Sequence, residues 1–531
     1  MTRNIQTFVI TSFLILASQL AFAGSATWNL NPTNGDWNTA ANWTPSTVPN
    51  GAADTATFDT TNKNVVALSS DVEVSSIVFN PGASSYTINA GGTISATALT
   101  LSGQGIVNNS GVLQNIFNAN LPANNQSFHG TLFTGTSKAG LMIMFTNQNS
   151  DVVGSFGTRF DDKSSADHAI FTNEGDARDA MGTSGFLEFF DRSTGGYATV
   201  TNEPGFHHGG TTVFGDSSSA GNSTITCNGG IAGAPVGGLV SLDGTATFGS
   251  ATLIANAGRP AGGLIMFNAL GQTGAARVEV FGNGTLDVSY GVPQPSIGSL
   301  EGDGLVHLGN HNLQVGYNSL STTFSGVIAD GGLVHAVNGS LTKVGATQLT
   351  LTNANTYTGG TAINGGTLLV GNTKGSGLGS GTVKVFDGTL GGNGIVSGSV
   401  IVGTGTGPGA FLAPAGGGKA PATFTISNAL TLNADATYIC SAKAPSSQLQ
   451  VDQIVANGVT ISGATFSFHP KISGMLQTGT FFTVISNTSA NPISGTFGDL
   501  ADGAIITVRG TNFQASYEGG DGNDLTLTVV P

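Results

Sequence analysis

Short apolar stretches of four to six residues recur through the middle of the chain, and each ends in a residue that favours a turn. β-Branched and aromatic residues fill these stretches, so each one predicts a short β-strand. Asparagine, aspartate and glycine then mark the turns between strands. One series ends at Asn173, Asn202, Asn228, Asn256 and Asn283, with spacings of 29, 26, 28 and 27 residues. A second series lies between them, at residues 187–191, 212–216, 239–243 and 264–268.

A repeat of about 27 residues with at least two short strands predicts stacked coils rather than separate globular domains. One coil cannot bury its own apolar face, so coils must stack around an interior column of Phe, Val, Ile and Leu. A β-propeller or a row of β-sandwiches is the alternative, but a propeller blade needs four strands in about 40 residues. We therefore predict an all-β, right-handed parallel β-helix, with Asn and Gly at corners that require positive φ.

Composition supports a folded chain and excludes several partners. The 531 residues are 39% hydrophobic and 9% charged, with a mean hydropathy of +0.14, which is unlike a disordered protein. The net charge of -14, without a Lys/Arg cluster, argues against nucleic acid and anionic membranes as partners. Cys227 and Cys440 provide neither a zinc spacing nor a disulfide framework, so we expect no metal and no cofactor. The oligomeric state stays open.

Residues 1–23 have the pattern of a secretory signal peptide. Arg3 precedes an apolar run at residues 8–16, and Ala21-Phe22-Ala23 forms a small-x-small cleavage site. The run is too short to span a bilayer. We expect a secreted or cell-surface protein with no membrane span in the mature chain, and a periplasmic location is the alternative.

Residues 24–65 contain all three tryptophans, Trp28, Trp37 and Trp43. The open end of a β-helix exposes unpaired backbone and apolar side chains, which large aromatic residues can cover. We therefore predict an N-terminal cap. The alternative is a platform of exposed Trp rings on which a carbohydrate stacks.

The remaining chain divides by composition. Residues 66–402 are assigned to the β-helix, although 110–165 are the least regular part and predict an insertion or imperfect turns. The polar run Asn124-Asn125-Gln126-Ser127 lies in this part. Residues 403–422 are rich in Gly and Pro and predict a linker. Residues 423–531 predict a C-terminal β domain that resembles a β-sandwich cap.

Residues 341–372 carry a motif that resembles a known family. Residues 353–361 read Asn-Ala-Asn-Thr-Tyr-Thr-Gly-Gly-Thr, and residues 363–370 read Ile-Asn-Gly-Gly-Thr-Leu-Leu-Val. This closely resembles the autotransporter-associated β-strand repeat, also called the passenger-associated transport repeat, and the flanks at 324–328 and 388–394 resemble its neighbours. The resemblance implies a β-helical passenger outside a Gram-negative-type cell. Autotransporters normally end in a translocator β-barrel, which we do not expect here, so another route of export or a periplasmic location follows.

Segment 159–192 has the highest density of charged residues and is the best candidate for an active site. Polysaccharide lyases and hydrolases built on β-helices need carboxylates in one groove, for Ca²⁺ or for acid–base chemistry. A solvated loop of mixed charge is the simpler reading, and strand alternation places Glu188 and Asp191 on opposite faces. We therefore assign no catalytic residue. The charged residues of segment 159–192 are Arg159, Asp161, Asp162, Lys163, Asp167, His168, Glu174, Asp176, Arg178, Asp179, Glu188, Asp191 and Arg192.

Two further motifs have simpler structural readings. His207 and His208 are adjacent and would point to opposite sides of a strand, so a turn is favoured over a metal site. Residues 519–524 match the start of a Ca²⁺-binding nonapeptide once, which predicts a turn before the last strand. The favoured function is thus a structural or adhesin-like surface protein with a polysaccharide or cell-surface partner. The alternatives are a polysaccharide-active enzyme and a glycan-binding module.

Overall fold

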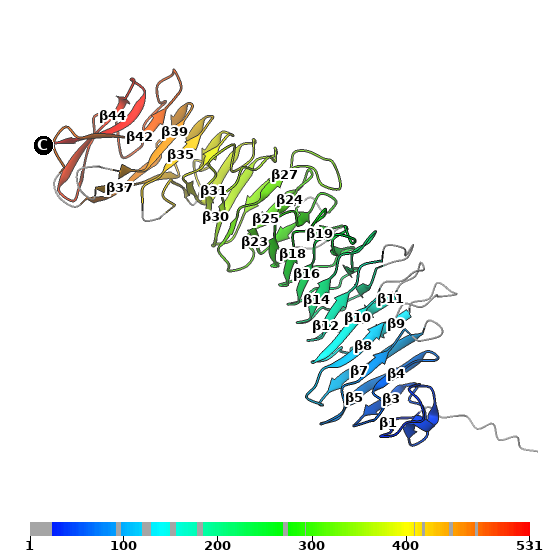
Figure 1. Ribbon diagram of the computed structural model, residues 1–531. Helices are drawn as coiled ribbons and strands as arrows, with labels where there is room; N and C mark the ends of the chain where they lie inside the picture. The colour runs from blue at the N-terminus through cyan, green and yellow to red at the C-terminus, as the bar shows by residue number, and fades with distance from the viewer. Residues whose placement is uncertain are drawn as a thin grey trace, which may run out of the picture.

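The computed structural model describes residues 24–91, 97–118, 129–148, 156–177, 184–268, 274–291, 294–407, 409–416, 420–444, 450–472 and 476–531. In these residues the chain forms an elongated rod of stacked coils, with the Trp-rich segment at one tip and the C-terminus at the other (Figure 1). The one helix found there is a single 3₁₀ turn, η1 (Ala40–Asn42). The expected signal peptide, residues 1–23, lies outside the described residues.

One side of the rod is a 14-stranded sheet to which each coil adds a strand. Its pairs are parallel, except that β1 and β2 pair antiparallel at the N-terminal tip. In spatial order the strands are β2 (Trp43–Thr44), β1 (Ala26–Trp28), β3 (Gly51–Phe58), β5 (Val72–Phe79), β7 (Ala98–Asn108), β9 (His129–Phe133), β11 (Phe156–Phe160), β13 (Phe186–Phe189), β15 (Thr211–Phe214), β17 (Leu239–Leu242), β19 (Leu264–Phe267), β21 (Thr285–Asp287), β24 (Leu305–His307) and β27 (Val327–Ala329).

The second sheet runs as one column in the N-terminal half and as two columns further on. The long strands β30 (Thr361–Val370) and β31 (Val383–Gly392) belong to both columns and join them. The first stretch is β4 (Val65–Ala67), β6 (Thr87–Asn89), β8 (Gln114–Asn118), β10 (Ile143–Asn147), β12 (Ile170–Asn173), β14 (Thr199–Asn202), β16 (Thr224–Cys227), β18 (Thr252–Ala255) and β20 (Arg277–Val280). The later strands are β22 (Ser296–Ile297), β23 (Ser299–Gly302), β25 (Asn312–Val315), β26 (Thr322–Phe324), β28 (Ser340–Lys343), β29 (Gln348–Leu351), β33 (Val400–Val402), β34 (Ala410–Ala413), β36 (Leu430–Leu432), β37 (Ala436–Ala444), β38 (Gln450–Val451), β40 (Val459–Ile461) and β41 (Thr465–Ile472).

A third sheet of seven strands covers the C-terminal part of the rod. Its first four strands pair in parallel, and its last three continue in antiparallel pairing. Phe468 of β41 lies 5.9 Å from Phe482 and 5.3 Å from Phe513 of this sheet, measured between ring centroids, so two sheets pack face to face here. The strands are β32 (Ile395–Val396), β35 (Thr423–Ile426), β39 (Gln453–Ala456), β42 (Phe481–Asn487), β45 (Asp524–Val530), β44 (Thr511–Gly519) and β43 (Ile505–Val508).

These pairings establish the all-β, parallel β-helix fold predicted from the sequence. They differ from the predicted linker at 403–422, because β34 lies inside that segment and pairs in parallel with both β31 and β37. Asp435 holds the segment in place. Its carboxylate accepts hydrogen bonds from the backbone N–H groups of Thr404, Gly405 and Gly407 at 3.0, 2.6 and 2.7 Å. Parallel stacking therefore continues past residue 402, as far as β39 and β42.

The predicted irregularity of residues 110–165 does not reach the strands of that segment. β8, β10 and β12 pair in parallel without a shift of register, and so do β9, β11 and β13. The polar run at residues 124–127 lies outside the described residues.

Apolar side chains form the interior column that the repeat predicts. Phe133, Phe160, Phe189 and Phe214 are fully buried on successive coils. Their rings stack with centroid separations of 4.6, 4.9 and 4.6 Å and interplanar angles of 8°, 7° and 9°. The separations match the spacing of neighbouring strands, about 4.8 Å, so stacking of identical residues and pairing of strands stabilise the same register.

A ladder of asparagines runs beside the Phe column. Asn118, Asn147, Asn173 and Asn202 are buried at the ends of successive strands, and each amide donates to the carbonyl of the next at 2.7 Å. The sequence prediction that these asparagines occupy positive-φ corners is wrong for Asn173 and Asn202, because both end strands with side chains directed inward.

The ladder ends at Asn202, although the asparagine series of the sequence continues to Asn283. Asn202 pairs in register with Cys227 rather than with Asn228. Asn228 instead lies beside Glu203 and Asn256, where its side chain bonds to both.

Candidate functional site

The N-terminal tryptophans form a buried cluster. Trp28, Trp37 and Trp43 are at most 1% exposed, and Trp43 lies 5.0 Å from each of the other two rings. Their indole N–H groups donate to backbone carbonyls, for example Trp37 to Pro49 at 2.9 Å. The rings pack on Phe58, the first aromatic residue of the interior column. This arrangement is that of a cap, and it contradicts the alternative of an exposed platform for carbohydrate.

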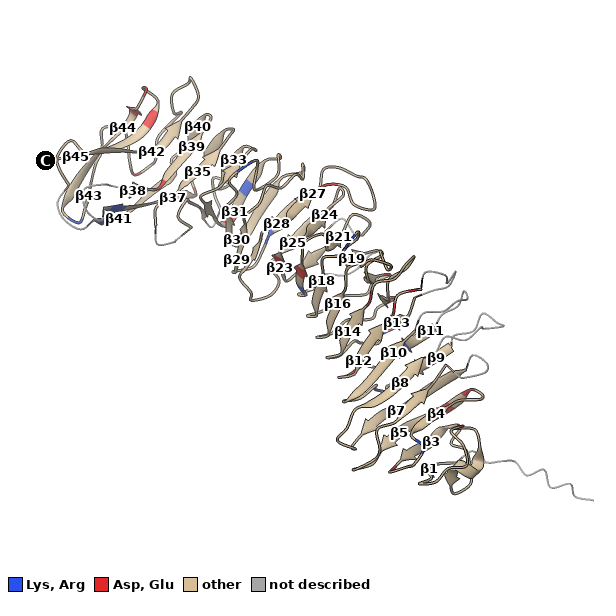
Figure 2. Ribbon diagram, viewed as in Figure 1, with Lys and Arg blue, Asp and Glu red and all other residues tan. Residues whose placement is uncertain are grey.

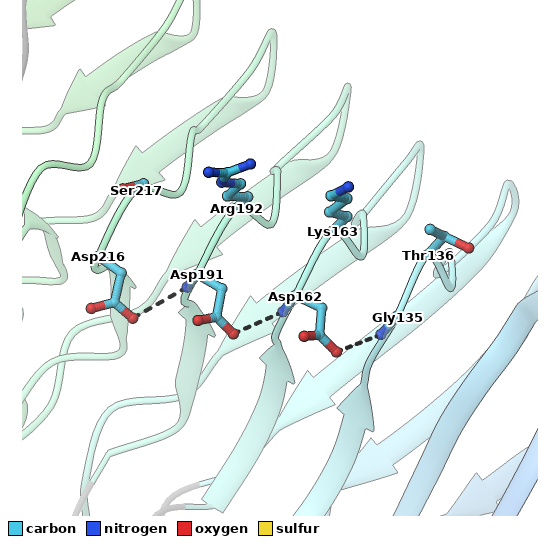
Figure 3. Close-up of a pocket in the computed structure, with 8 residues that line it drawn as sticks. All are labelled: Gly135, Thr136, Asp162, Lys163, Asp191, Arg192, Asp216 and Ser217. Carbon is cyan, nitrogen blue, oxygen red and sulfur yellow. Dashed lines mark hydrogen bonds between the residues drawn. The ribbon is translucent and has the colours of Figure 1, made fainter.

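The charged segment 159–192 covers more than one coil, and parts of it lie at the corner that directly follows the strands of the 14-stranded sheet. Asp162, Asp191 and Asp216 take the same corner position on three coils, with φ of 58°, 54° and 52°. Their carboxylates accept hydrogen bonds from the backbone N–H groups of the preceding coil, namely those of Gly135, Asp162 and Asp191, at 2.8, 3.0 and 3.2 Å (Figure 3). Aspartate tolerates the left-handed conformation because its side chain can satisfy a local backbone group.

Beside this acidic row lies a basic row formed by the next residue of each corner. Lys163 and Arg192 are exposed on adjacent coils, between Thr136 and Ser217 (Figure 3). The two rows line an open groove of about 640 Å³. The residues that line it are the corner pairs 135–136, 162–163, 191–192 and 216–217. Elsewhere charges are sparse along the rod (Figure 2).

Other charged residues of the segment pair locally. Arg159 donates to Asp161 at 2.8 Å, and its guanidinium lies 4.5 Å from the centre of the Phe190 ring. Glu188 is the register neighbour of Arg159 on the next coil. Burial raises the pKa of the Glu188 carboxyl, while the charge of Arg159 opposes that rise. Asp161 and Glu188 thus flank one cation on the outer face of the sheet.

A second cluster joins the far end of the segment to the His pair. The buried carboxylate of Asp176 accepts the backbone N–H groups of His207 and His208 at 2.7 and 2.8 Å, and it lies 3.1 Å from Nδ1 of His207. Although burial acts to raise the pKa of Asp176, these hydrogen bonds and the neighbouring His208 hold it below its usual value. The turn predicted for His207 and His208 is therefore present, and Asp176 organises it. Arg178 and Asp179 lie outside the described residues.

The remaining site residues of the segment stay apart. His168 bonds to Asp167 at 2.9 Å and stacks on Tyr197 of the next coil at 5.0 Å. Glu174 is half-buried, and this burial raises the pKa of its carboxyl. Within the described ranges, no group of three or more His, Cys, Asp or Glu residues is arranged to hold a metal ion.

The predicted turn at residues 519–524 is also found. Gly519 and Asp524 close the hairpin between β44 and β45, and the Asp524 carboxylate accepts the backbone N–H of Asn487 at 2.8 Å. Both cysteines are buried, and burial raises the pKa of each thiol, that of Cys227 to about 12.

Two residues that could bear on function, Asp216 and Lys343, were not identified from the sequence. Asp216 lies beyond the charged segment, although its distance of 25 residues from Asp191 matches the repeat and could have revealed it. Lys343 is 1% exposed at the end of β28, where its ammonium donates to the carbonyls of Val344, Gly345 and Gly365. Burial lowers the pKa of Lys343 to about 8. A lone Lys after an apolar strand carries no signal of such burial.

The coils around Lys343 have a distinctive form. β28 and β29 each pair with one half of β30, which turns between them at Gly365 and Gly366. The Tyr357 hydroxyl and the Thr361 hydroxyl lie 2.6 Å apart in the interior of this coil. Lys343 lies at the corner where β30 passes from one column of strands to the other, and its ammonium satisfies backbone carbonyls there.

Comparison with known proteins finds a family model that matches this part of the chain. No curated protein matches the chain, and in the described residues no helix is long and apolar enough to cross a membrane. Residues 341–370, which span β28, β29 and β30, match the sequence model of the Passenger-associated-transport-repeat, so the β-helix of this chain carries one such repeat.

Proposed function

We propose that the protein is exported and acts outside the cell as a rod-shaped structural or adhesin-like protein, whose flank rather than a pocket contacts its partner. The observation that carries this proposal is the passenger-associated repeat, built into a β-helix that continues on both sides of it. The repeat and the fold fit a passenger-like protein. The N-terminal sequence pattern supports export through a signal peptide.

The corner carboxylates support a role without catalysis. Acid–base or nucleophilic chemistry needs a carboxylate that is free to meet the substrate. Asp162 and Asp191 instead bond to backbone N–H groups of neighbouring coils, and Asp161 pairs with Arg159. These three carboxylates therefore have a structural use within the stack.

Cell fractionation with protease shaving tests the location. The proposal expects the mature chain at the cell surface or in the medium, with surface copies removed by protease added to intact cells. Retention in the cytoplasm would contradict it. An adhesion assay then compares cells with and without the protein, and equal attachment would refute the adhesive role.

An activity panel tests the non-catalytic role. The wild-type chain is incubated with pectin and alginate, in parallel with Asp161→Ala, Asp162→Ala and Asp191→Ala variants. We expect no chain cleavage by any of the four. Cleavage by the wild type that is lost in all three variants would overturn the proposal and establish an enzyme.

A further inference from the structure

The outer face of the second sheet carries a regular array of threonines between β10 and β18. The five strands β10, β12, β14, β16 and β18 lie side by side along the rod, and each directs two side chains outward (Figure 1). No shift of register interrupts their pairing, so the outward positions form two straight rows. One row is Met144, Ile170, Thr199, Thr224 and Thr252, and the other is Thr146, Thr172, Thr201, Thr226 and Ile254.

This threonine array carries no charge, and its hydroxyl groups are not used by the protein. All ten side chains are half-buried or exposed. In the part of the chain that the structure describes, none of the seven threonine hydroxyls has a hydrogen-bond partner. Arg277 and Glu279 take the same two rows on the next strand, β20, and end the array. Because a charged group holds water tightly in its own shell, an uncharged face leaves the adjacent water free to follow the hydroxyl and methyl groups.

The array is held rigid from behind. The inward side chains of the same strands, Phe145, Phe171, Val200, Ile225 and Leu253, are at most 1% exposed. Threonine and isoleucine are β-branched and keep few χ1 rotamers, so the spacing of the backbone is passed on to their hydroxyl and methyl groups. Each threonine hydroxyl can donate one hydrogen bond and accept two, while its methyl group leaves the nearest water molecules bonded to one another.

The spacing of the array is close to that of ice. Neighbouring strands lie about 4.8 Å apart, and alternate residues of one strand lie about 6.6 Å apart. In a tetrahedral water network with oxygens about 2.75 Å apart, second neighbours are about 4.5 Å apart and the hexagonal axis repeats every ~7.3 Å. Over five coils the misfit along the rod sums to about 1.2 Å, which is less than half of one lattice spacing. The whole array therefore stays in step with one ice plane.

We propose that the threonine array binds ice, with the hydroxyl and methyl groups of its two rows ordering the first layer of lattice water. The plane that contains both matching repeats is a prism plane of hexagonal ice. A protein fixed on that plane forces the crystal to grow as curved fronts between bound molecules, and curvature lowers the temperature at which growth continues. This activity goes beyond the proposed function and requires no partner other than water.

Thermal hysteresis, the gap between the melting and freezing temperatures of a single ice crystal, tests the inference on the purified chain. We expect a measurable gap for the wild type, with growth arrested on the prism planes. Thr201→Tyr, at the centre of the array, should reduce the gap at least threefold, because the larger ring holds the lattice away from the neighbouring coils. The matched control is Thr100→Tyr, at a half-buried outward position of β7 in the other sheet, which should leave the gap unchanged.

Circular dichroism and the thermal midpoint verify that both variants keep the fold. If Thr201→Tyr does not fold, Thr199→Tyr at an exposed position of the same strand takes its place. Absence of a gap in the wild type, or an equal loss in the array variant and in Thr100→Tyr, would overturn the inference. These outcomes are measured on the purified chain and do not depend on its location in the cell, so failure of the ice measurement leaves the proposed function standing.

Discussion

Removal of one rung of the buried asparagine ladder should destabilise the coils around it. Asn173 accepts a hydrogen bond from Asn147 at 2.7 Å and donates to Asn202 at 2.7 Å and to the Thr212 hydroxyl at 3.1 Å. In Asn173→Ala the Asn147 amide loses the one partner described for it, which costs about 1–3 kcal/mol for a buried donor. The Asn202 carbonyl keeps the Thr212 hydroxyl at 2.9 Å, so its loss is smaller.

The lost hydrogen bonds, together with the small cavity that Asn173→Ala leaves, give a destabilisation of about 2–4 kcal/mol. Unfolding of a long stack need not be two-state, so the quantity to measure is the free energy of local opening, from hydrogen exchange of peptides that cover β12 and β14. Thr172→Ala, on the half-buried outer side of the same strand, is the control and should change that free energy by less than about 0.5 kcal/mol.

A double-mutant cycle makes the reasoning refutable. Because Asn147→Ala removes the donor that Asn173→Ala would leave unpaired, the two substitutions together should cost about 1 kcal/mol less than their sum. Strict additivity, or an effect of Asn173→Ala no larger than that of Thr172→Ala, would mean that the ladder does not couple neighbouring coils.

Three further predictions follow from buried or hydrogen-bonded groups. Backbone N–H donors hold the pKa of Asp435 at about 2, below its value in the unfolded chain, so the stabilisation by its carboxylate is present above about pH 4 and is lost as the pH falls through 2. Asp435→Asn should therefore lower the thermal midpoint at pH 6, and its difference from the wild type should vanish near pH 2. An equal difference at both pH values would contradict this. Trp43→Ala should cost about 3–5 kcal/mol at the N-terminal tip, and acrylamide should quench native Trp fluorescence only weakly, whereas strong quenching would mean that the cap is open. Iodoacetamide should modify Cys227 and Cys440 only after unfolding, since both thiols are buried with raised pKa values, and rapid labelling of the native chain would show that the interior column is accessible.

The period of the repeat could be predicted from the sequence because the interior admits few residue types. Apolar strands such as those ending at Phe189 and Phe214 recur wherever the coil returns to the same side, and this pattern is visible without a structure. The N-terminal cap could be predicted for a similar reason, because three Trp residues in one short segment need a surface to cover.

Side-chain direction could not be predicted in the same way. Asparagine at the end of a strand can turn the chain or face inward, and only the register with Thr131, Thr158 and Thr212 decides that Asn118, Asn147 and Asn202 bond inside. The 403–422 segment was predicted as a linker because Gly and Pro dominate it. A single carboxylate 30 residues from Gly405, that of Asp435, orders that segment from the next coil.

The alignment of residues along the corner groove could not be predicted from the sequence either. Asp162, Asp191 and Asp216 are visible in the sequence as charged residues, but their alignment into one row requires the number of residues in each coil. The segment 159–192 was singled out by its charge, and the structure places Asp162, Lys163, Asp191 and Arg192 on two coils at one corner. Arg159 and Glu188 lie instead on the sheet, and Asp176 lies at the His turn, so these charges do not surround one centre.

The central claim is that coils stack in a continuous register, so that distance along the rod grows in proportion to the number of coils. Thr172, Glu279 and Thr350 lie in one column of outward-facing positions. Counted along β12, β14, β16, β18, β20, β23, β26 and β29, Glu279 lies four strand pairings from Thr172, and Thr350 lies seven strand pairings from Thr172. Double electron–electron resonance between spin labels on Thr172→Cys/Glu279→Cys and Thr172→Cys/Thr350→Cys should give narrow distributions centred near 19 and 34 Å, from a spacing of about 4.8 Å per coil. Similar distances for the two pairs, or broad distributions of the kind that separate modules on a flexible linker produce, would contradict the stacked rod.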